Sequence, residues 1–579
     1  MYLLLAAHPG GAAVQELTPA GHARPAAPEP RVVPHGELPA VVRQLEAARP
    51  DGQPPRWIWH RTQDWYPALL AAGVEVERCY DVSLCGNILA FSQFTAHTEY
   101  ARNSDRVPAE DPLLPPRALQ PPPPPADQDA LFDDLGGTGP APRWGLAELR
   151  AEYTAQQGAL AAVDLAENRR GRLQLLLAAE SAAAMVAAEM QHAGVPWRED
   201  LHEQMLADCL GPRPHPGQRP ARLEALAREL RALLNTPALN PDSPQELMRA
   251  LHRNGIEVKS TRKWELRESS HPVIEPLLEY KKLSRLHTAN GWTWLDAWVH
   301  GGRFRPEYVV GGVVSGRWAS RGGGALQIPR LVRGAVHADP GHKLIVADAS
   351  QLEPRVLVAL ARDSSMAEAA RDQDLYAGIA AKGFGGDRAK AKTALLGAMY
   401  GATSGEAGRL MPQLARTYPR AVDFVERAAR AGESGATVTT RLGRSTPPPS
   451  ELWFRSQRSA TAEEQRRAES IARSRGRFTR NFVVQGSAAD WAACWLAELR
   501  RRLRAWQPGG TTGTGGAVRA ELVFFLHDEV MVHAPVGAVD AVIGAIEEAA
   551  SAAKELLFGT IPVEFPVSVA VVDSYDKAK

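Results

Sequence analysis

Cysteine is scarce in this chain of 579 residues, and its four copies form no recognisable pattern. They are Cys79, Cys85, Cys209 and Cys494. No two of them form a Cys-x-x-Cys pair, and none belongs to a cysteine–histidine series at zinc spacing. We therefore expect free thiols in a reducing cytoplasm rather than a zinc site or a set of disulfides.

A net charge of either sign is nearly absent as well. The 67 lysines and arginines almost cancel the 66 acidic residues, so the formal charge is +1. Bulk charge therefore gives no evidence for nucleic-acid binding, and any basic groove must come from local clustering. No uncharged apolar stretch reaches the roughly 18 residues of a membrane span. The N-terminal run MYLLLAAHPGG is too short for a signal peptide, so we predict no membrane association.

The composition changes along the chain. Residues 1–115 mix short apolar runs with glycine and proline, as in a small α/β unit, and a polyproline linker follows at 121–125. Residues 145–290 have helical patterns, and after residue 300 strands and helices alternate. The clearest helices are predicted at 173–190, 222–235 and 244–255. The length suggests three or four domains.

The segment LIVADASQLEPR (344–355) is the first that carries chemistry. A buried strand delivers Asp348 at its carboxyl end, and a helix begins at once. A carboxylate beside the positive end of a helix suits a metal ion. Ser350 and Glu353 have the spacing of a capping box, so Glu353 has an alternative role as a helix cap.

The segment RAKAKTALLGAMYG (388–401) is the second. One face of this predicted helix carries Arg388, Lys392, Leu396 and Tyr400 at every fourth position. The helix dipole disfavours cations in the first turns, so the two basic residues make sense if an anion such as a triphosphate docks there. A solvated basic face is the alternative.

The third is the predicted hairpin ELVFFLHDEVMVHAP (521–535), with His527, Asp528 and Glu529 at its tip. Strong apolar strands on both sides would fix this turn to a sheet, and a rigid sheet is where a catalytic carboxylate should lie. An ordinary exposed turn is the alternative, because aspartate is common in turns.

Together these segments resemble motifs A, B and C of the family A DNA polymerases, the bacterial DNA polymerase I group. The family patterns are D-Y-S-Q-I-E-L-R, R-x(3)-K-x(3)-F-G-x(2)-Y-G and H-D-E, and they occur here in the same order. Three further stretches are similar to family sequences: LNPDSPQELMRAL (239–251), SGRWAS with LQIP (315–320 and 326–329) and RGRFTRNFVVQGSAAD (475–490). The resemblance covers residues 180–579 well and the first 165 faintly.

The resemblance implies a multidomain fold of the α/β and α+β classes. An N-terminal ribonuclease H-like domain of the exonuclease type would precede a right-hand polymerase with palm, fingers and thumb. The implied parts are a degenerate 3′–5′ exonuclease-like domain at 1–165 with a proline-rich linker near 115–145, connecting helices and thumb at 166–300, the first part of the palm at 301–375, the fingers at 376–480 and the second part of the palm at 481–579.

The resemblance also implies the residues of a two-metal polymerase site. Asp348 and Asp528 would hold two Mg²⁺ ions, which Mn²⁺ could replace, and Glu529 would also be catalytic. The residues implied to bind the incoming nucleotide are Gln351, Glu353, Arg388, Lys392, Leu396 and Tyr400, among which Glu353 would exclude ribonucleotides. The residues implied to contact primer–template DNA are Arg317, Arg477, Asn481, Gln485 and His527.

The chain departs from the family pattern at two notable positions. Ala349 replaces the tyrosine of motif A, and Leu396 replaces the aromatic residue of motif B that meets the incoming nucleotide. Loss of that ring should weaken nucleotide ordering, since base–aromatic stacking is worth roughly 1–3 kcal/mol. Both metal-binding aspartates remain, so we expect rate and fidelity to suffer more than activity itself.

The N-terminal region lacks the acids of a working exonuclease. Its first strand has no Asp-x-Glu, and Trp65 rather than Asp64 occupies the catalytic position of the second motif. Asp81 matches a lesser position, and the best match to the third motif, Tyr153, is followed by Gln157 instead of aspartate. Two divalent cations cannot be held without these carboxylates, so we predict no proofreading.

We therefore predict a monomeric, cytoplasmic and nucleoid-associated DNA polymerase. It would use deoxynucleoside triphosphates and primer–template DNA in replication or in repair gap filling. A bifunctional 3′–5′ exonuclease/DNA polymerase and a non-catalytic DNA-binding relative stay open as alternatives. A nuclease whose polymerase part only holds the substrate is disfavoured by the missing Asp-x-Glu.

Overall fold

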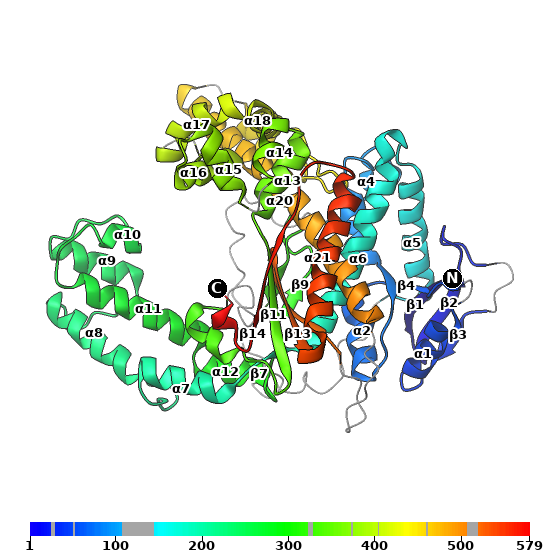
Figure 1. Ribbon diagram of the computed structural model, residues 1–579, viewed down its shortest axis with the longest axis horizontal. Helices are drawn as coiled ribbons and strands as arrows, with labels where there is room; N and C mark the ends of the chain where they lie inside the picture. The colour runs from blue at the N-terminus through cyan, green and yellow to red at the C-terminus, as the bar shows by residue number, and fades with distance from the viewer. Residues whose placement is uncertain are drawn as a thin grey trace. The chain divides into compact units, whose positions relative to one another are not determined.

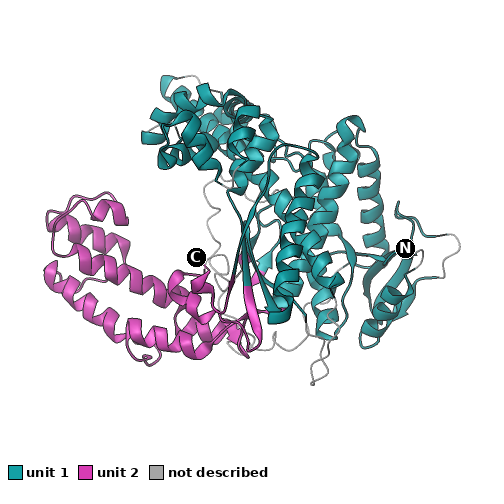
Figure 2. Ribbon diagram, viewed as in Figure 1, with its two compact units in different colours: residues 1–192, 308–319, 345–570 teal, residues 193–307, 320–344, 571–579 magenta. Residues whose placement is uncertain are grey.

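The computed structural model describes residues 1–24, 29–49, 52–106, 144–321, 328–371, 374–402, 405–458, 461–506 and 519–578 (Figure 1). The polyproline segment at 121–125 and two residues of the LQIP stretch, Leu326 and Gln327, lie outside them. The chain forms two compact units (Figure 2). Unit 1 comprises residues 1–192, 308–319 and 345–570, and unit 2 comprises residues 193–307, 320–344 and 571–579.

Unit 1 begins with a five-stranded sheet. Its spatial order is β3 (Arg31–Val33), β2 (Gly11–Leu17), β1 (Tyr2–His8), β4 (Arg56–Trp59) and β5 (Arg78–Asp81). β1 and β2 form an antiparallel hairpin, whereas β4 pairs in parallel with both β1 and β5. Successive side chains of β1 point to opposite faces, so Leu3 and Leu5 enter one hydrophobic core and Leu4 and Ala6 another.

Five helices accompany this sheet, and a sixth follows them. The five are α1 (Leu38–Ala48), α2 (Thr62–Ala71), α3 (Val82–Phe91), α4 (Glu99–Arg102) and α5 (Leu146–Ala161). The sixth, α6 (Arg169–Ala193), contains the helix predicted at 173–190. The stretch that ends with α6 is long and apolar enough to cross a membrane, but 72% of its most apolar window is buried inside the protein. Its side chains contribute to both hydrophobic cores, so we interpret α6 as a core helix.

A four-stranded sheet supports the predicted catalytic segments. Its order is β12 (Glu521–Leu526), β13 (Glu529–Pro535), β11 (His342–Ala349) and β14 (Val567–Val572). The strand predicted at 343–348 and the hairpin at 521–535 are thus confirmed. Alternate residues of β11 share a core with two long helices, α20 (Ala462–Ala505) and α21 (Val539–Phe558). Trp495 of α20 donates a 3.2 Å hydrogen bond to the carbonyl of Ile546 in α21.

A group of helices lies between β11 and α20 in the sequence. They are α13 (Leu352–Ala361), α14 (Ser364–Ala369), α15 (Leu375–Gly383), α16 (Arg388–Tyr400), α17 (Gly405–Thr417), α18 (Pro419–Glu433) and α19 (Glu451–Ser456). α16 confirms the helix predicted at 388–401. α18 packs closely on α20, because Gly432 faces Thr479: a Cβ at position 432 would lie 2.1 Å from the Thr479 hydroxyl oxygen. Only glycine permits this approach.

Unit 2 is mainly helical. Its helices are α7 (Glu199–Leu210), α8 (Ala221–Leu233), α9 (Pro244–Arg253), α10 (Lys263–Leu266), α11 (Ile274–Asn290) and α12 (Trp292–Trp298). α8 and α9 confirm the helices predicted at 222–235 and 244–255, and Ser243 caps α9 by accepting a hydrogen bond from the Glu246 amide. Its three-stranded sheet has the order β6 (Val195–Pro196), β8 (Arg303–Phe304) and β7 (Val299–His300). A separate pair, β9 (Glu307–Val309) and β10 (Ala319–Arg321), follows in the sequence.

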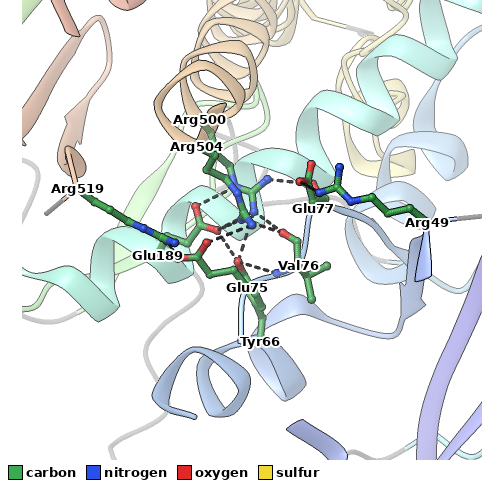
Figure 3. A network of polar contacts seen from close by, with 9 residues as sticks. All are labelled: Arg49, Tyr66, Glu75, Val76, Glu77, Glu189, Arg500, Arg504 and Arg519. Carbon is green, nitrogen blue, oxygen red and sulfur yellow. Dashed lines mark hydrogen bonds and ion pairs between the residues drawn. The ribbon is translucent and has the colours of Figure 1, made fainter. Parts of the chain in front are cut away.

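A polar network within unit 1 fastens the end of α20 to the N-terminal region (Figure 3). Arg500 donates to both carboxylate oxygens of Glu189 in α6, at 2.7 and 2.8 Å. It also donates to the backbone carbonyls of Val76 and Glu77, between α2 and β5. Tyr66 of α2 donates its hydroxyl to Glu189. Arg504 of α20 also bonds to Glu189 and to the Val76 carbonyl, so more than one arginine joins the end of α20 to the N-terminal sheet region.

Candidate active site

The carboxyl end of β11 and the β12–β13 turn are joined by a backbone hydrogen bond. The amide of Ala349 donates to the carbonyl of Asp528 at 2.8 Å. β13, which follows Asp528, lies beside β11 in the sheet. Asp348 and Asp528, both half-buried, thus belong to backbone segments that touch, although they are remote in the sequence.

The turn itself is tight. Leu526 pairs with Glu529 across the hairpin, and the Asp528 amide donates to the Leu526 carbonyl at 2.7 Å. His527 takes the left-handed conformation with φ of 56° and is exposed. Partial desolvation of its imidazole at the turn lowers the pKa of His527, and the nearby charge of Arg317 lowers it further. Glu529 is not at the tip as predicted: it is the first residue of β13 and is buried.

A pocket of about 240 Å³ lies at this turn. Its lining residues are Arg317, Gln351, Leu352, Glu353, Pro354, Tyr376, Tyr400, Ala488, Ala489, His527 and Asp528. Members of all three predicted motifs therefore meet in one place. The predicted site residues that do not line it are Asp348, Arg388, Lys392, Leu396, Arg477, Asn481, Gln485 and Glu529.

Glu353 is held by two side chains from other segments. Arg317 forms an ion pair with one carboxylate oxygen, and Tyr400 at the end of α16 donates its hydroxyl to the other at 2.7 Å. Burial raises the pKa of the Tyr400 phenol, and this hydrogen bond raises it further, so Tyr400 stays a donor. The capping-box prediction is wrong. Residue 351 occupies the N-cap position without a side-chain bond, and Ser350 instead shares a 2.7 Å hydrogen bond with Ser568.

An ion pair connects the start of α16 to the start of α15. Arg388 donates from Nε to Asp374 Oδ2 at 2.6 Å, and its guanidinium lies 5.5 Å from the Tyr376 ring centroid. Gln351 donates to the other Asp374 oxygen at 3.0 Å and accepts from the Leu375 amide at 2.9 Å. Burial would raise the pKa of Asp374, but the hydrogen bonds from Arg388 and Gln351 lower it overall. This carboxylate is therefore ionised and holds the arginine predicted to bind phosphate.

The remaining predicted nucleotide residues of α16 have different surroundings. Lys392 is exposed, and its ammonium lies 5.9 Å from the centroid of the Tyr376 ring. Leu396 is half-buried and packs against the main hydrophobic core. Leu396 therefore serves as a packing residue here, and the Tyr376 ring lies close to both predicted phosphate-binding cations.

The predicted DNA-contacting residues of α20 lie four residues apart on one helix face. Arg477 is exposed, Gln485 is half-buried, and Asn481 has a buried carbonyl oxygen without a hydrogen-bond partner. Gly401, which ends α16 with φ of 73°, lies against this face: a Cβ there would come within 3.0 Å of Arg477 Cγ. An unpaired amide oxygen on a face with an exposed arginine is consistent with a polar ligand along this stripe.

The surviving acids of the N-terminal region have structural partners. Asp64 accepts two hydrogen bonds from Arg61, at 2.6 and 3.1 Å. Asp81 is buried, caps α3 and accepts from both the amide and the hydroxyl of Thr62. Tyr153, the best match to the third exonuclease motif, is buried and donates to a backbone carbonyl. Across the described ranges no three His, Cys, Asp or Glu side chains gather in a way that could hold a metal ion.

A buried charged cluster escaped the sequence analysis. Arg444 binds Glu180 of α6 at 3.0 Å and Asp490 of α20 at 2.8 Å, and Thr440 donates to Asp490 at 2.6 Å. Gly316 lies against it, since a Cβ there would be 2.4 Å from the Arg444 guanidinium carbon. The available signal was Asp490 itself, because an acid within an apolar helix needs a buried partner.

Comparisons with known proteins complete the description of the site. The sequence model described as DNA polymerase family A matches residues 217–577. Thermostable DNA polymerase I of Thermus filiformis is 27% identical over 333 residues, which cover 52% of this chain and 36% of that protein. The Thermus thermophilus enzyme is 29% identical over 332 residues, which cover 53% of this chain and 36% of that protein. DNA polymerase I of Deinococcus radiodurans is 25% identical over 373 residues, which cover 57% of this chain and 35% of that protein. The aligned part thus spans little more than a third of these relatives.

Among solved structures, the chain is similar to the POL domain of Pol1 from M. smegmatis in complex with DNA primer-template and dNTP. The TM-score is 0.64 at 20% identity, and the match covers 94% of this chain and 90% of that one. At this identity the likeness concerns the fold alone, and it confirms the predicted multidomain α/β and α+β architecture.

Proposed function

The chain belongs to DNA polymerase family A, and on this premise we propose that it is a template-directed DNA polymerase that adds deoxynucleotides to a primer 3′ end. The observation that supports this most directly is the 2.8 Å hydrogen bond from the Ala349 amide to the Asp528 carbonyl. It joins the two segments that bear the carboxylates proposed to bind metal. Replication or repair gap filling would use this activity.

Asp348 and Asp528 would hold two Mg²⁺ ions, or Mn²⁺ in their place. The donor chemistry fits, because Mg²⁺ is usually bound through one or two carboxylates together with substrate phosphates and water. When bound, the two ions would stabilise the negative charge that develops during in-line displacement at the α-phosphorus. Glu529, buried at the start of β13, would support the turn that carries Asp528.

The chain's own residues would bind and orient the nucleotide. Arg388 and Lys392 would contact its phosphates, with Arg388 exchanging Asp374 for the triphosphate. Glu353, fixed by Tyr400, would lie against C2′ of the sugar and exclude ribonucleotides. The residues that would contact the primer–template are Arg317, Arg477, Asn481, Gln485 and His527.

We further propose that the N-terminal region has no proofreading activity. Asp64 and Asp81 are held by Arg61 and Thr62, which leaves neither carboxylate as a ready metal ligand. The polymerase would act as a monomer in the cytoplasm, associated with the nucleoid and not with a membrane.

Primer extension with four deoxynucleotides tests the proposal. The wild type should extend a primed template with Mg²⁺, whereas Asp348→Ala and Asp528→Ala should lose at least about a thousandfold in rate while still binding the DNA. Asp540→Ala, at the exposed first turn of α21, is the matched control and should extend normally. Equal extension by all four proteins would refute the metal assignment.

A non-catalytic DNA-binding relative is the second candidate, and the packing of Leu396 favours it. This side chain packs against the hydrophobic core, so α16 offers no ring to the incoming base at position 396. The same experiment separates the two: a wild type that binds primer–template without extending it, with Mg²⁺ or with Mn²⁺, would establish the non-catalytic role.

A further inference from the structure

A second pocket, of about 290 Å³, lies in unit 1 away from the predicted active site. It is formed by the start of α6, the end of α13, the loop at 439–441 and the end of α21. Its charged lining residues are Glu167, Arg169, Arg172, Arg362 and Arg441. Four guanidinium groups and one carboxylate give this small pocket a net charge of +3.

The pocket is separate from the site around Glu353. Both are touched by α13, but Glu353 lies in the first turn of this helix and Arg362 at its C-cap. Nine residues of α-helix span about 14 Å. A ligand in the arginine-lined pocket would therefore not occupy the position of the incoming nucleotide.

Two of the four arginines have an ordinary structural explanation. Arg441 donates from Nε to the carbonyl of Leu557 in the last turn of α21, and Arg362 is the C-cap of α13. Helix C-termini carry partial negative charge and attract cations. The hydrogen bond to Leu557 fixes Arg441 without any ligand, and the helix end favours a cation at Arg362.

The other two arginines have no such explanation. Arg169 and Arg172 lie in the first turn of α6, which contains no acidic residue, where the helix dipole disfavours cations. Their carboxylate partners are weak: Glu167 is 3.4 Å from Arg172 and largely exposed, and Asp164 is 3.9 Å from Arg169. Long ion pairs with a solvent-exposed carboxylate contribute little, roughly 0–1 kcal/mol.

Contacts within the pocket also point to a missing partner. The guanidinium carbons of Arg169 and Arg172 lie 5.7 and 5.6 Å from the Phe94 ring centroid, which holds both groups in a defined arrangement. The Nε atom of Arg172 is buried and has no hydrogen-bond partner. Burial lowers the pKa of Arg441, and the nearby charges of Arg172 and Arg362 lower it further. The positive charges of the cluster therefore outweigh the one carboxylate, Glu167, that lines the pocket with them.

We propose that this pocket binds the di- or triphosphate group of a small ligand, either inorganic pyrophosphate or a nucleoside polyphosphate, independently of the polymerase site. Several guanidiniums converging beside a helix N-terminus match the oxygens of a polyphosphate better than a single carboxylate. Apart from two threonines, the rest of the lining is apolar, including Phe424, Phe558 and Ile561, and would suit a nucleoside. The volume is near the lower limit of small-molecule sites, about 300 Å³.

Isothermal titration of the full chain tests this, with inorganic pyrophosphate and with ATP as separate probes. Titration in EDTA suppresses metal-dependent binding at the polymerase site. Arg172→Gln and Arg441→Gln should each weaken binding about tenfold, since each removes a charge-assisted contact. Glu167→Gln should strengthen it about twofold by removing the opposing exposed charge. Arg455→Gln, at an exposed arginine of α19 that forms an ion pair with Glu451, is the control and should bind like the wild type.

The outcomes separate the sources of phosphate. If both probes bind and the variants change their affinity as predicted, the pocket is a polyphosphate site. If ATP alone binds, its ligand is a nucleoside polyphosphate. Equal affinity in all variants, with normal thermal unfolding, would overturn the proposal. A third outcome would also overturn the proposal: neither small anion binds, but a ten-nucleotide oligothymidylate does, and Arg172→Gln abolishes that binding. The pocket would then bind a DNA backbone. Arg172→Gln should extend primers at the wild-type rate, which keeps this test independent of the proposed polymerase activity.

Discussion

Tyr400 donates its hydroxyl to Oε2 of Glu353 at 2.7 Å and so links the end of α16 to the first turn of α13. Arg317 holds the other oxygen, and only 12% of the Glu353 side chain is exposed. A carboxylate with both oxygens bound has little freedom to move. Such a fixed group can act as a steric check on whatever lies beside it in the pocket.

We predict that Glu353→Ala increases ribonucleotide incorporation, by about tenfold or more relative to deoxynucleotides, because it opens the space at the sugar C2′. Tyr400→Phe should produce a smaller increase, about fivefold, since it removes one hydrogen bond that fixes the carboxylate. Single-nucleotide insertion with matched ribo- and deoxynucleotides measures both. Glu451→Ala, an exposed glutamate of α19, serves as the control. Unchanged sugar discrimination in Glu353→Ala would mean that the carboxylate only ties α13 to α16.

Asp374 competes with the triphosphate for Arg388 in our proposal. Asp374→Asn should therefore lower the KM for deoxynucleotides about two- to fivefold, because a partly exposed ion pair contributes roughly 0–1 kcal/mol. Asparagine still caps α15, so the helix should be preserved. Steady-state insertion kinetics would show it, with Asp387→Asn at the N-cap of α16 as the control. A KM that rises instead would mean that Asp374 positions Arg388 for the nucleotide.

Local patterns in the sequence were enough for the elements that carry the predicted motifs. Each local pattern corresponds to a described strand or helix. These patterns are the apolar run before Asp348, the spacing of four residues between Arg388, Lys392, Leu396 and Tyr400, and the apolar stretches on both sides of His527. These signals are short-range, because periodicity and strand alternation depend on neighbouring residues alone. The roles of the site residues stay predictions.

Contacts between distant segments could not be read in the same way. Ser350 and Glu353 have capping-box spacing, yet the helix starts one residue later, with residue 351 at its N-cap. Glu353 instead bonds to residues 36 and 47 positions away. The cluster around Arg444 joins segments 264 residues apart. No local pattern encodes which partner a buried charge finds, since the tertiary fold decides it.

The N-terminal region should not digest DNA. A 3′-labelled single strand with Mg²⁺ or Mn²⁺ should survive incubation with the wild type, because Asp64 and Asp81 are committed to Arg61 and Thr62. Denaturing gel electrophoresis follows the label over time. Asp64→Ala should give the same trace. If the wild type digests the DNA strongly and Asp64→Ala abolishes this digestion, the N-terminal region is a working exonuclease.

Glu189 gives the network of Figure 3 a defined response to pH. Burial alone would raise the pKa of its carboxyl, but the adjacent charges of Arg500 and Arg504 outweigh this and lower it below the ordinary value of 4.5. A group whose pKa is lower in the folded state stabilises the fold at pH values above its unfolded pKa. That contribution is lost as the pH falls through 4.5 and then through the lower folded-state value.

We therefore predict that Glu189→Gln destabilises the protein at pH 7 by about 1–3 kcal/mol. This value is lower than for a fully buried ion pair, because a quarter of the Glu189 side chain is exposed. The gap between wild type and variant should narrow below pH 4.5, because the Glu189 carboxyl of the unfolded chain takes up a proton there before that of the folded protein does. Urea unfolding followed by tryptophan fluorescence at pH 7, 5 and 4 measures this. Glu77→Gln, in a surface pair with Arg49, should change the unfolding midpoint little at any of these pH values. A gap of constant size between wild type and Glu189→Gln would show that Glu189 contributes through packing and not through its charge.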